Sequence, residues 1–214
     1  MRVGIIQASS QTSKNQILYA LTQKAAVRDE IINFGCFENE PEKYSYVEIS
    51  IEIGLLLASN AVDFIVTGCS SGQGMMLACN NFPGVLCGYA PTAQDAFLFG
   101  RINAGNAISV PLGLNYGWAG ELNLRYTLSA LFEQPFGIGY PAEEAVKKME
   151  DTEMLNSIQL LSKIPMVDLL DRLNKDLVNR ALNRQNVVSY VLNYGKKQDI
   201  LRWIKNRCGG CSAC

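Results

Sequence analysis

The chain has 214 residues and contains no histidine. Histidine is the commonest general base and the commonest metal ligand, so acid–base chemistry here must use Cys, Asp, Glu, Lys or Tyr. Long apolar runs are missing too. The longest, residues 53–58, is too short to span a bilayer, and residues 1–15 show no signal-peptide pattern. We therefore expect a soluble cytoplasmic protein with no membrane partner.

Positively and negatively charged side chains are nearly equal in number. Lysine and arginine together number 19 and aspartate and glutamate 20, which gives a formal net charge of -1. Binding to a nucleic-acid backbone draws on a basic surface, so we expect no nucleic-acid partner. Hydrophobic residues make up 48% of the chain and charged residues 18%, which is typical of a globular protein with a large core.

The seven cysteines are odd in number and irregular in spacing, which argues against a secreted disulfide framework. Cys208, Cys211 and Cys214 form two overlapping C-x-x-C steps at the end of the chain. A structural zinc or iron–sulfur site usually needs four ligands, and the fourth would have to come from elsewhere. We therefore expect an exposed tail, with no metal and no cofactor; metal binding is the alternative.

Short apolar segments alternate with helical patterns over the first 145 residues. The predicted strands cover residues 2–7, 30–35, 62–68, 85–89 and 106–110. The predicted helices are a first one marked by Ile17, Leu21 and Ala25, then 46–60, 74–81, 91–103 and 118–132. This alternation is typical of a parallel sheet covered on both faces. The sequence predicts a three-layer, doubly wound, Rossmann-like α/β sandwich with five parallel strands.

After residue 145 the strand signals stop. Three segments are helical by pattern: 152–163, 165–182 and 199–206. The second carries an apolar stripe at helical spacing: Met166, Leu169, Leu173 and Leu177. The stripe indicates packing on the sheet domain or on a second subunit. The predicted organisation is an α/β domain (1–145), a helical extension (146–207) and a cysteine-rich tail (208–214).

The segment of residues 67–81 follows the clearest strand and opens a helix. Ligands of parallel α/β sheets bind at the carboxyl ends of the strands. Gly72 and Gly74 allow close approach of the backbone, and the amides of the helix start favour an anion. A thiolate at Cys69 would be stabilised there and could take a proton from a carbon next to a carbonyl. The loop favours enediolate or thiol nucleophilic chemistry; a buried structural cysteine is the alternative.

Three better-known loops do not fit this segment. A P-loop needs a lysine after its second glycine, and none follows Gly74. A dinucleotide-binding fingerprint would need glycine at position 77, which is Leu77. A cysteine phosphatase loop would need arginine at position 75, which is Met75. Nucleotide hydrolysis, dinucleotide binding and cysteinyl-phosphate chemistry are therefore disfavoured.

The loop resembles the ribose-5-phosphate isomerase B / galactose-6-phosphate isomerase family, whose pattern is C-G-T-G-x-G-[MI]-x-x-A-x-N-K followed by V-P-G-[IV]. With the same spacing this chain reads C-S-S-G-Q-G-M-M-L-A-C-N-N and then F-P-G-V over residues 69–85. Weaker matches flank the loop: Val62-Asp63, Asn103 with Asn106, and Gly120-Glu121-Leu122. The chain is most similar to a longer branch of the family that has a helical extension and shares Gly139-Tyr140-Pro141.

The resemblance implies an aldose–ketose isomerase, independent of metals, that moves a proton between C1 and C2 of a small sugar or sugar phosphate. It implies that Cys69 is the base, that Ser71 assists proton transfer and ring opening, and that Asn103 holds the enediolate. A further set is expected to contact the substrate: Ser9, Tyr46, Ser70, Gly72, Gln73, Gly74 and Arg101. A homodimer or homotetramer with sites shared across the interface is also implied.

Several positions depart from the family pattern. The histidines of the pattern fall on Ser9 and Ile102, and the arginines that grip the substrate phosphate fall on Gly113, Tyr140 and Glu144. The altered positions leave open a sugar-binding relative that has lost catalysis. The cysteine tail leaves open a different cysteine or redox enzyme on the same fold.

Overall fold

The computed structural model describes residues 1–208. In this part of the chain five strands form one parallel sheet in the order β2-β1-β3-β5-β4. The strands are β1 Arg2–Ile6, β2 Glu30–Gly35, β3 Phe64–Cys69, β4 Cys87–Tyr89 and β5 Ala107–Pro111. The predicted five-stranded parallel sheet is confirmed, with small shifts at the strand ends.

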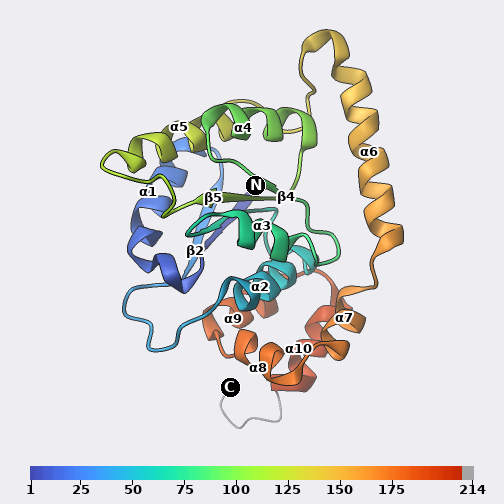
Figure 1. Cartoon of the computed structure of the whole chain (residues 1–214). Helices are drawn as coiled ribbons and strands as arrows, with labels where there is room; N and C mark the ends of the chain where they lie inside the picture. The colour runs from blue at the N-terminus through green and yellow to red at the C-terminus, as the bar shows by residue number, and fades with distance from the viewer. Residues whose placement is uncertain (209–214) are drawn as a thin grey trace.

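Helices cover both faces of the sheet (Figure 1). One face carries α1 Asn15–Ala25, α4 Ala93–Leu98 and α5 Gly120–Phe132; the other carries α2 Tyr46–Ala58 and α3 Gln73–Cys79. Side chains of β3 alternate between the two apolar clusters: Phe64 and Val66 pack on the α5 side, whereas Ile65 and Cys69 pack on the α2 side. The doubly wound sandwich is confirmed, and Cys69 faces the α2 layer.

The predicted helix over 91–103 ends early. A capping box of Thr92 and Asp95 starts α4, but after Leu98 the chain winds into a short π-helix, Phe99–Asn103. Ala104 then takes a left-handed conformation with φ of 45°, which ends the helix. Because a π-turn is wider than an α-turn, the side chains of this turn point differently from those of a regular helix.

The prediction of one helix over 165–182 is wrong. The structure has α7 Met166–Arg172 and α8 Lys175–Leu182, separated by an extended Leu173. The side-chain oxygen of Asn174 accepts hydrogen bonds from the backbone N–H groups of Asp176 and Leu177, and in this way it caps the start of α8. Two 3-10 segments, Ser9–Lys14 and Ala142–Glu144, and three further helices complete the described chain: α6 Ala145–Ser162, α9 Gln185–Tyr194 and α10 Gln198–Cys208.

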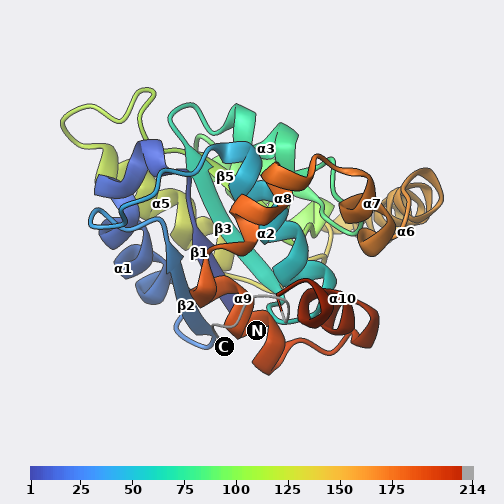
Figure 2. The same ribbon diagram turned by 90° about the horizontal axis from the view of Figure 1, so that it is seen from below.

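Helices α7 to α10 pack beneath α2 and share its apolar cluster (Figures 1 and 2). The predicted stripe lies against this cluster, with Met166 buried and Leu169, Leu173 and Leu177 partly buried. No helix among the described residues is long and apolar enough to cross a membrane. Cys211 and Cys214, and with them the predicted tail motif, lie outside the described residues.

Candidate active site

Cys69 is the last residue of β3, and its side chain is 7% exposed. Its partner in the sheet register is Pro111, the last residue of β5, so the thiol lies at the carboxyl edge of two neighbouring strands. The backbone N–H of Gly72 donates a hydrogen bond to Sγ at 3.2 Å. A donor in this position stabilises negative charge on the sulfur.

The turn after Cys69 depends on Gly72, which has φ of +77°. A Cβ at this position would lie 2.8 Å from the ring of Tyr89 and 2.9 Å from the carbonyl carbon of Val110, so only glycine fits. The hydroxyl of Ser109 donates to the Gly72 carbonyl at 2.7 Å and fixes the turn to β5. Sequence reasoning missed Tyr89 and Ser109, because strand pairing alone brings them to the turn.

The two serines of the loop have different partners. Ser70 Oγ accepts a hydrogen bond from Gln11 Nε2 at 2.8 Å, and the Ser70 carbonyl accepts one from the Gly113 N–H at 3.0 Å. Ser71 Oγ accepts one from the Gln73 N–H at 3.3 Å. The first contact joins the loop after β1 to the loop after β3. Gln11 was also missed; its place in a polar loop directly after a strand was the only signal in the sequence.

Ser9 begins the 3-10 segment after β1, and its Oγ accepts a hydrogen bond from the Tyr44 N–H at 2.8 Å. Ser9 lines an open cavity of about 460 Å³ with Ser10, Lys43, Tyr44, Ser45 and Glu48. Lys43 contributes a cation to this cavity.

Tyr46 begins α2, and its ring lies beside the loop glycine Gly74, where an added Cβ would be 3.5 Å from the ring. Tyr46 and Gly74 line a groove of about 360 Å³ together with Leu173 and Leu177 of the helical extension. The extension therefore forms one wall of the groove beside the Cys69 loop, which the sequence did not predict.

Two other buried cysteines are poor candidates for a base. Burial raises the pKa of Cys36 to about 11, although the nearby Arg184 acts in the opposite direction. A hydrogen bond with Cys87, together with burial, raises the pKa of Cys79 well above its ordinary value. Both thiols stay protonated at neutral pH.

Asn103 and Arg101 lie in the π-helix, apart from these residues. Asn103 is exposed and lines a different cavity, of about 470 Å³, with Asn80 and Cys87 among its walls. Arg101 is 1% exposed; its Nη2 donates to the Leu131 carbonyl at 2.7 Å, and its guanidinium lies between two phenylalanine rings. Burial also lowers the pKa of Arg101. This placement argues against substrate contact by Arg101.

A family model described as Ribose/Galactose Isomerase matches residues 4–120, which carry the sheet and the Cys69 loop. The chain belongs to the ribose/galactose isomerase family. A solved 4-deoxy-L-threo-5-hexosulose-uronate ketol-isomerase complexed with a tartrate is 36% identical, with a TM-score of 0.91 over 96% of this chain and 98% of that one. A ribose-5-phosphate isomerase from Vibrio parahaemolyticus is 33% identical, with the same TM-score and coverage.

A type B ribose 5-phosphate isomerase from Trypanosoma cruzi has the same fold at 20% identity, with a TM-score of 0.62. It covers 76% of this chain and 98% of its own length, whereas the two relatives above cover 96% of this chain. The helical extension is therefore shared with other long isomerases of the family. Comparison with curated protein sequences gives no match.

Three positions at which the ribose/galactose isomerase pattern has arginines supply no free cation here. At position 113, a Cβ would lie 3.3 Å from Gln11 Nε2 and 3.3 Å from the Ser70 backbone. A residue with a side chain would therefore crowd Gln11 and Ser70, whereas Gly113 does not. Tyr140 packs edge-on against Phe97 at 5.3 Å, and Glu144 pairs with Lys148. Among residues 1–208, no group of three Cys, Asp or Glu side chains is placed to hold a metal ion.

Proposed function

We propose that this isomerase interconverts an aldose and a ketose through an enediolate, with Cys69 as the base. The thiolate takes the proton from C2, next to the open-chain carbonyl at C1, and returns it to C1, while the hydroxyl proton of O2 passes to O1 and the carbonyl moves to C2. The hydrogen bond from the Gly72 amide to Cys69 Sγ, at the carboxyl edge of the sheet, is the observation that carries the proposal.

The neighbouring groups have roles that follow from their positions. Ser71 carries the loop hydroxyl proposed to assist ring opening. The Gly72 N–H already donates to Cys69 Sγ and the Gln73 N–H to Ser71 Oγ, so the Gly74 N–H, in the first turn of α3, is the proposed donor to the oxyanion. Ser9 lines the open cavity and Tyr46 the groove described above, and both are proposed to contact the sugar. Ser70 keeps the loop attached to Gln11.

The substrate we propose is an unphosphorylated sugar acid, the class to which the uronate of the ketol-isomerase relative belongs. Phosphate is usually held by several cationic or N–H donors, and the three family positions that would supply arginine do not do so here. Lys43 contributes one positive charge to the Ser9 cavity, and the one carboxylate in its lining, Glu48, is already paired with Arg180; this suits a substrate carboxylate with a single negative charge.

Incubation in deuterated water tests this reaction. The panel holds 4-deoxy-L-threo-5-hexosulose uronate, unphosphorylated pentoses and hexoses, ribose 5-phosphate and galactose 6-phosphate. We expect deuterium at C1 or C2 of the sugar acid, and Cys69→Ala should abolish the exchange. Cys87→Ala is the matched control, because Cys87 is equally buried, at 7% exposed, and should retain exchange.

Two results would contradict the proposal. Sugar binding without any exchange would favour the non-catalytic alternative, which the loss of every histidine motivates. Full exchange in Cys69→Ala would exclude Cys69 as the base. Exchange on a sugar phosphate alone would correct the substrate class and leave the mechanism intact.

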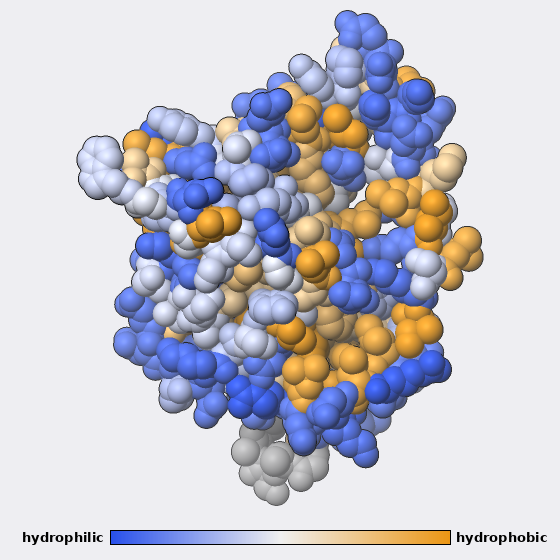
Figure 3. All heavy atoms as spheres, viewed as in Figure 1, coloured by the Kyte–Doolittle hydropathy of each residue, from blue (hydrophilic) through white to orange (hydrophobic). Residues whose placement is uncertain are grey.

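We also propose that the protein is a homo-oligomer. Helix α6 has no buried residue, and it exposes a set of large apolar side chains: Val146, Met149, Met154, Leu155, Ile158, Leu160 and Leu161. Figure 3 shows apolar side chains, in orange, on α6 and on the adjoining surface. Contiguous exposed apolar surface of this kind is typical of a protein interface. A second copy could also bring its Asn103 to the Cys69 loop, which one chain does not do.

A further inference from the structure

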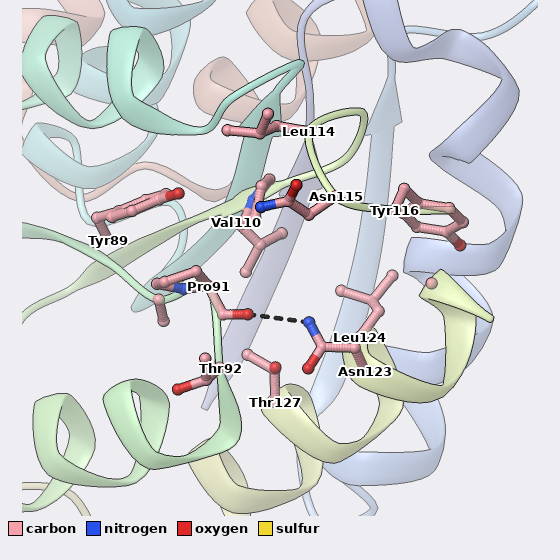
Figure 4. Close-up of a pocket in the computed structure, with 13 residues that line it drawn as sticks. Tyr89, Pro91, Thr92, Val110, Leu114, Asn115, Tyr116, Asn123, Leu124 and Thr127 are labelled. Carbon is pink, nitrogen blue, oxygen red and sulfur yellow. Dashed lines mark hydrogen bonds between the residues drawn. The ribbon is translucent and has the colours of Figure 1, made fainter. Parts of the chain in front are cut away.

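A further cavity lies at the carboxyl edge of β4 and β5, on the opposite face of the sheet from the Cys69 sulfur (Figure 4). Its walls come from the loop after β4, the loop after β5 and the start of α5. Val110 and Leu124, which line it, belong to the apolar cluster of the α5 side, whereas Cys69 belongs to the α2 side. The cavity is therefore separate from the proposed active site.

The cavity has a volume of about 250 Å³. At roughly 30 Å³ per water this equals about eight waters, which suits a molecule the size of a monosaccharide. The described residues that line it include no Lys, Arg, Asp or Glu. Of the charged residues near the lining, Lys14 lies over the Tyr116 ring, Asp95 bonds Thr92, and Glu121 acts on Tyr116 from outside the lining. An uncharged ligand fits this lining.

Thr127 provides the clearest sign that a ligand belongs there. It is 1% exposed, and its hydroxyl has no hydrogen-bond partner among the described residues. A buried polar group without a partner costs free energy, so it normally has a partner such as a water or a ligand. Figure 4 shows Thr127 beside Asn123 on the α5 wall, facing the space below Tyr89 and Pro91.

Asn115, Asn123 and the ring of Tyr89 also line the cavity. Asn123 Nδ2 donates to the Pro91 carbonyl at 2.9 Å, which fixes its amide so that Oδ1 is left to accept a hydrogen bond. Asn115 extends from the opposite loop toward Tyr89 (Figure 4). The Tyr89 ring forms an apolar wall on which the C–H face of a sugar ring can pack. Its edge also abuts Gly72, the residue that hydrogen-bonds Cys69.

We propose that this cavity is a second small-molecule site, which binds an uncharged sugar in its closed ring form. The ring packs on Tyr89, while its hydroxyl groups donate to Asn123 Oδ1 and bond with Thr127 and Asn115. Because the Tyr89 ring also abuts Gly72, an occupant packed on Tyr89 would be linked to the Cys69 loop through this one ring. The site does not depend on Cys69 chemistry.

Methyl glycosides test the proposal, since they are locked in the ring form and cannot be isomerised. Saturation-transfer NMR with the full chain and methyl β-D-galactopyranoside or methyl β-D-ribofuranoside should show contact, strongest at the ring C–H protons. Thr127→Val and Asn115→Gly should each weaken binding by roughly threefold to tenfold, as expected for a lost hydrogen bond. Glycine suits position 115 because Asn115 has φ of 58°.

Thr67→Val is the matched control: Thr67 is also buried with an unpartnered hydroxyl, but it lies in β3 and should leave binding unchanged. Thermal melting checks that each variant folds. Absence of saturation transfer to both glycosides would overturn the proposal. Equal binding to wild type, Thr127→Val and Asn115→Gly would also overturn it, as would loss of binding in Ser71→Ala alone, which would assign the glycoside to the Cys69 loop.

Discussion

Arg184 attaches the helical extension to the sheet domain, and its removal should destabilise the whole chain. It lies between α8 and α9 and is 4% exposed. Its Nη1 pairs with Glu52 of α2 at 2.8 Å, and its Nη2 pairs with Glu40 at 2.9 Å and donates to the Phe34 carbonyl. Glu52 is itself 0% exposed, so it has no route to solvent when Arg184 is lost.

Arg184→Met keeps much of the side-chain length and removes the charge. At about pH 9, where Glu52 is charged, removing one partner of the buried ion pair costs about 3–5 kcal/mol. For a chain of this size each kcal/mol lowers Tm by roughly 2–4 °C, so we expect a decrease of about 6–20 °C. Burial raises the pKa of Glu52 to about 8 although Arg184 favours its charged form, so the loss should be larger at about pH 9 than at about pH 6.

Circular dichroism melts at both pH values measure the effect. Arg180→Met is the control, since Arg180 makes a similar ion pair with Glu48 from a half-exposed position and should lower Tm much less. The double variant Glu52→Leu/Arg184→Met should recover most of the loss, because it leaves no buried charge in the pair. The reasoning fails if Arg184→Met melts like Arg180→Met, or if the double variant is no more stable than the single one.

Three further predictions concern Glu52, the apolar surface of α6 and Lys43. The raised pKa of Glu52 means that the folded chain holds a proton that the unfolded chain releases, so stability should fall between about pH 4.5 and 8, and Glu52→Gln should flatten this dependence in urea titrations. Leu161→Glu on α6 should shift the protein to a smaller species in analytical ultracentrifugation, whereas Val27→Glu, at another exposed apolar position, should not. Lys43→Met should raise KM for the uronate several-fold and leave kcat nearly unchanged; an unaltered KM would remove Lys43 from substrate recognition.

The layered fold could be predicted because strand signals are local. The β-branched run before Cys69, and the equivalent runs before and after it, identify the strands without knowledge of their neighbours. The break at Leu173 was missed, because apolar periodicity continues through it and only the Asn174 cap reveals it. The π-helix of Phe99–Asn103 was missed because no residue type in this segment distinguishes a π-turn from the end of an α-helix.

The sequence alone determined the Cys69 loop, since its spacing, its glycines and its place after a strand are all local features. Only the tertiary structure decided what surrounds the loop: the ring of Tyr89 against Gly72, the Gln11 contact to Ser70, and the helical extension as a wall of the groove. The tertiary structure also buried Arg101, which was expected to contact the substrate in place of the missing family arginines. Local pattern specifies which elements form, but strand order and helix packing, set by burial of distant apolar residues, determine which side chains meet.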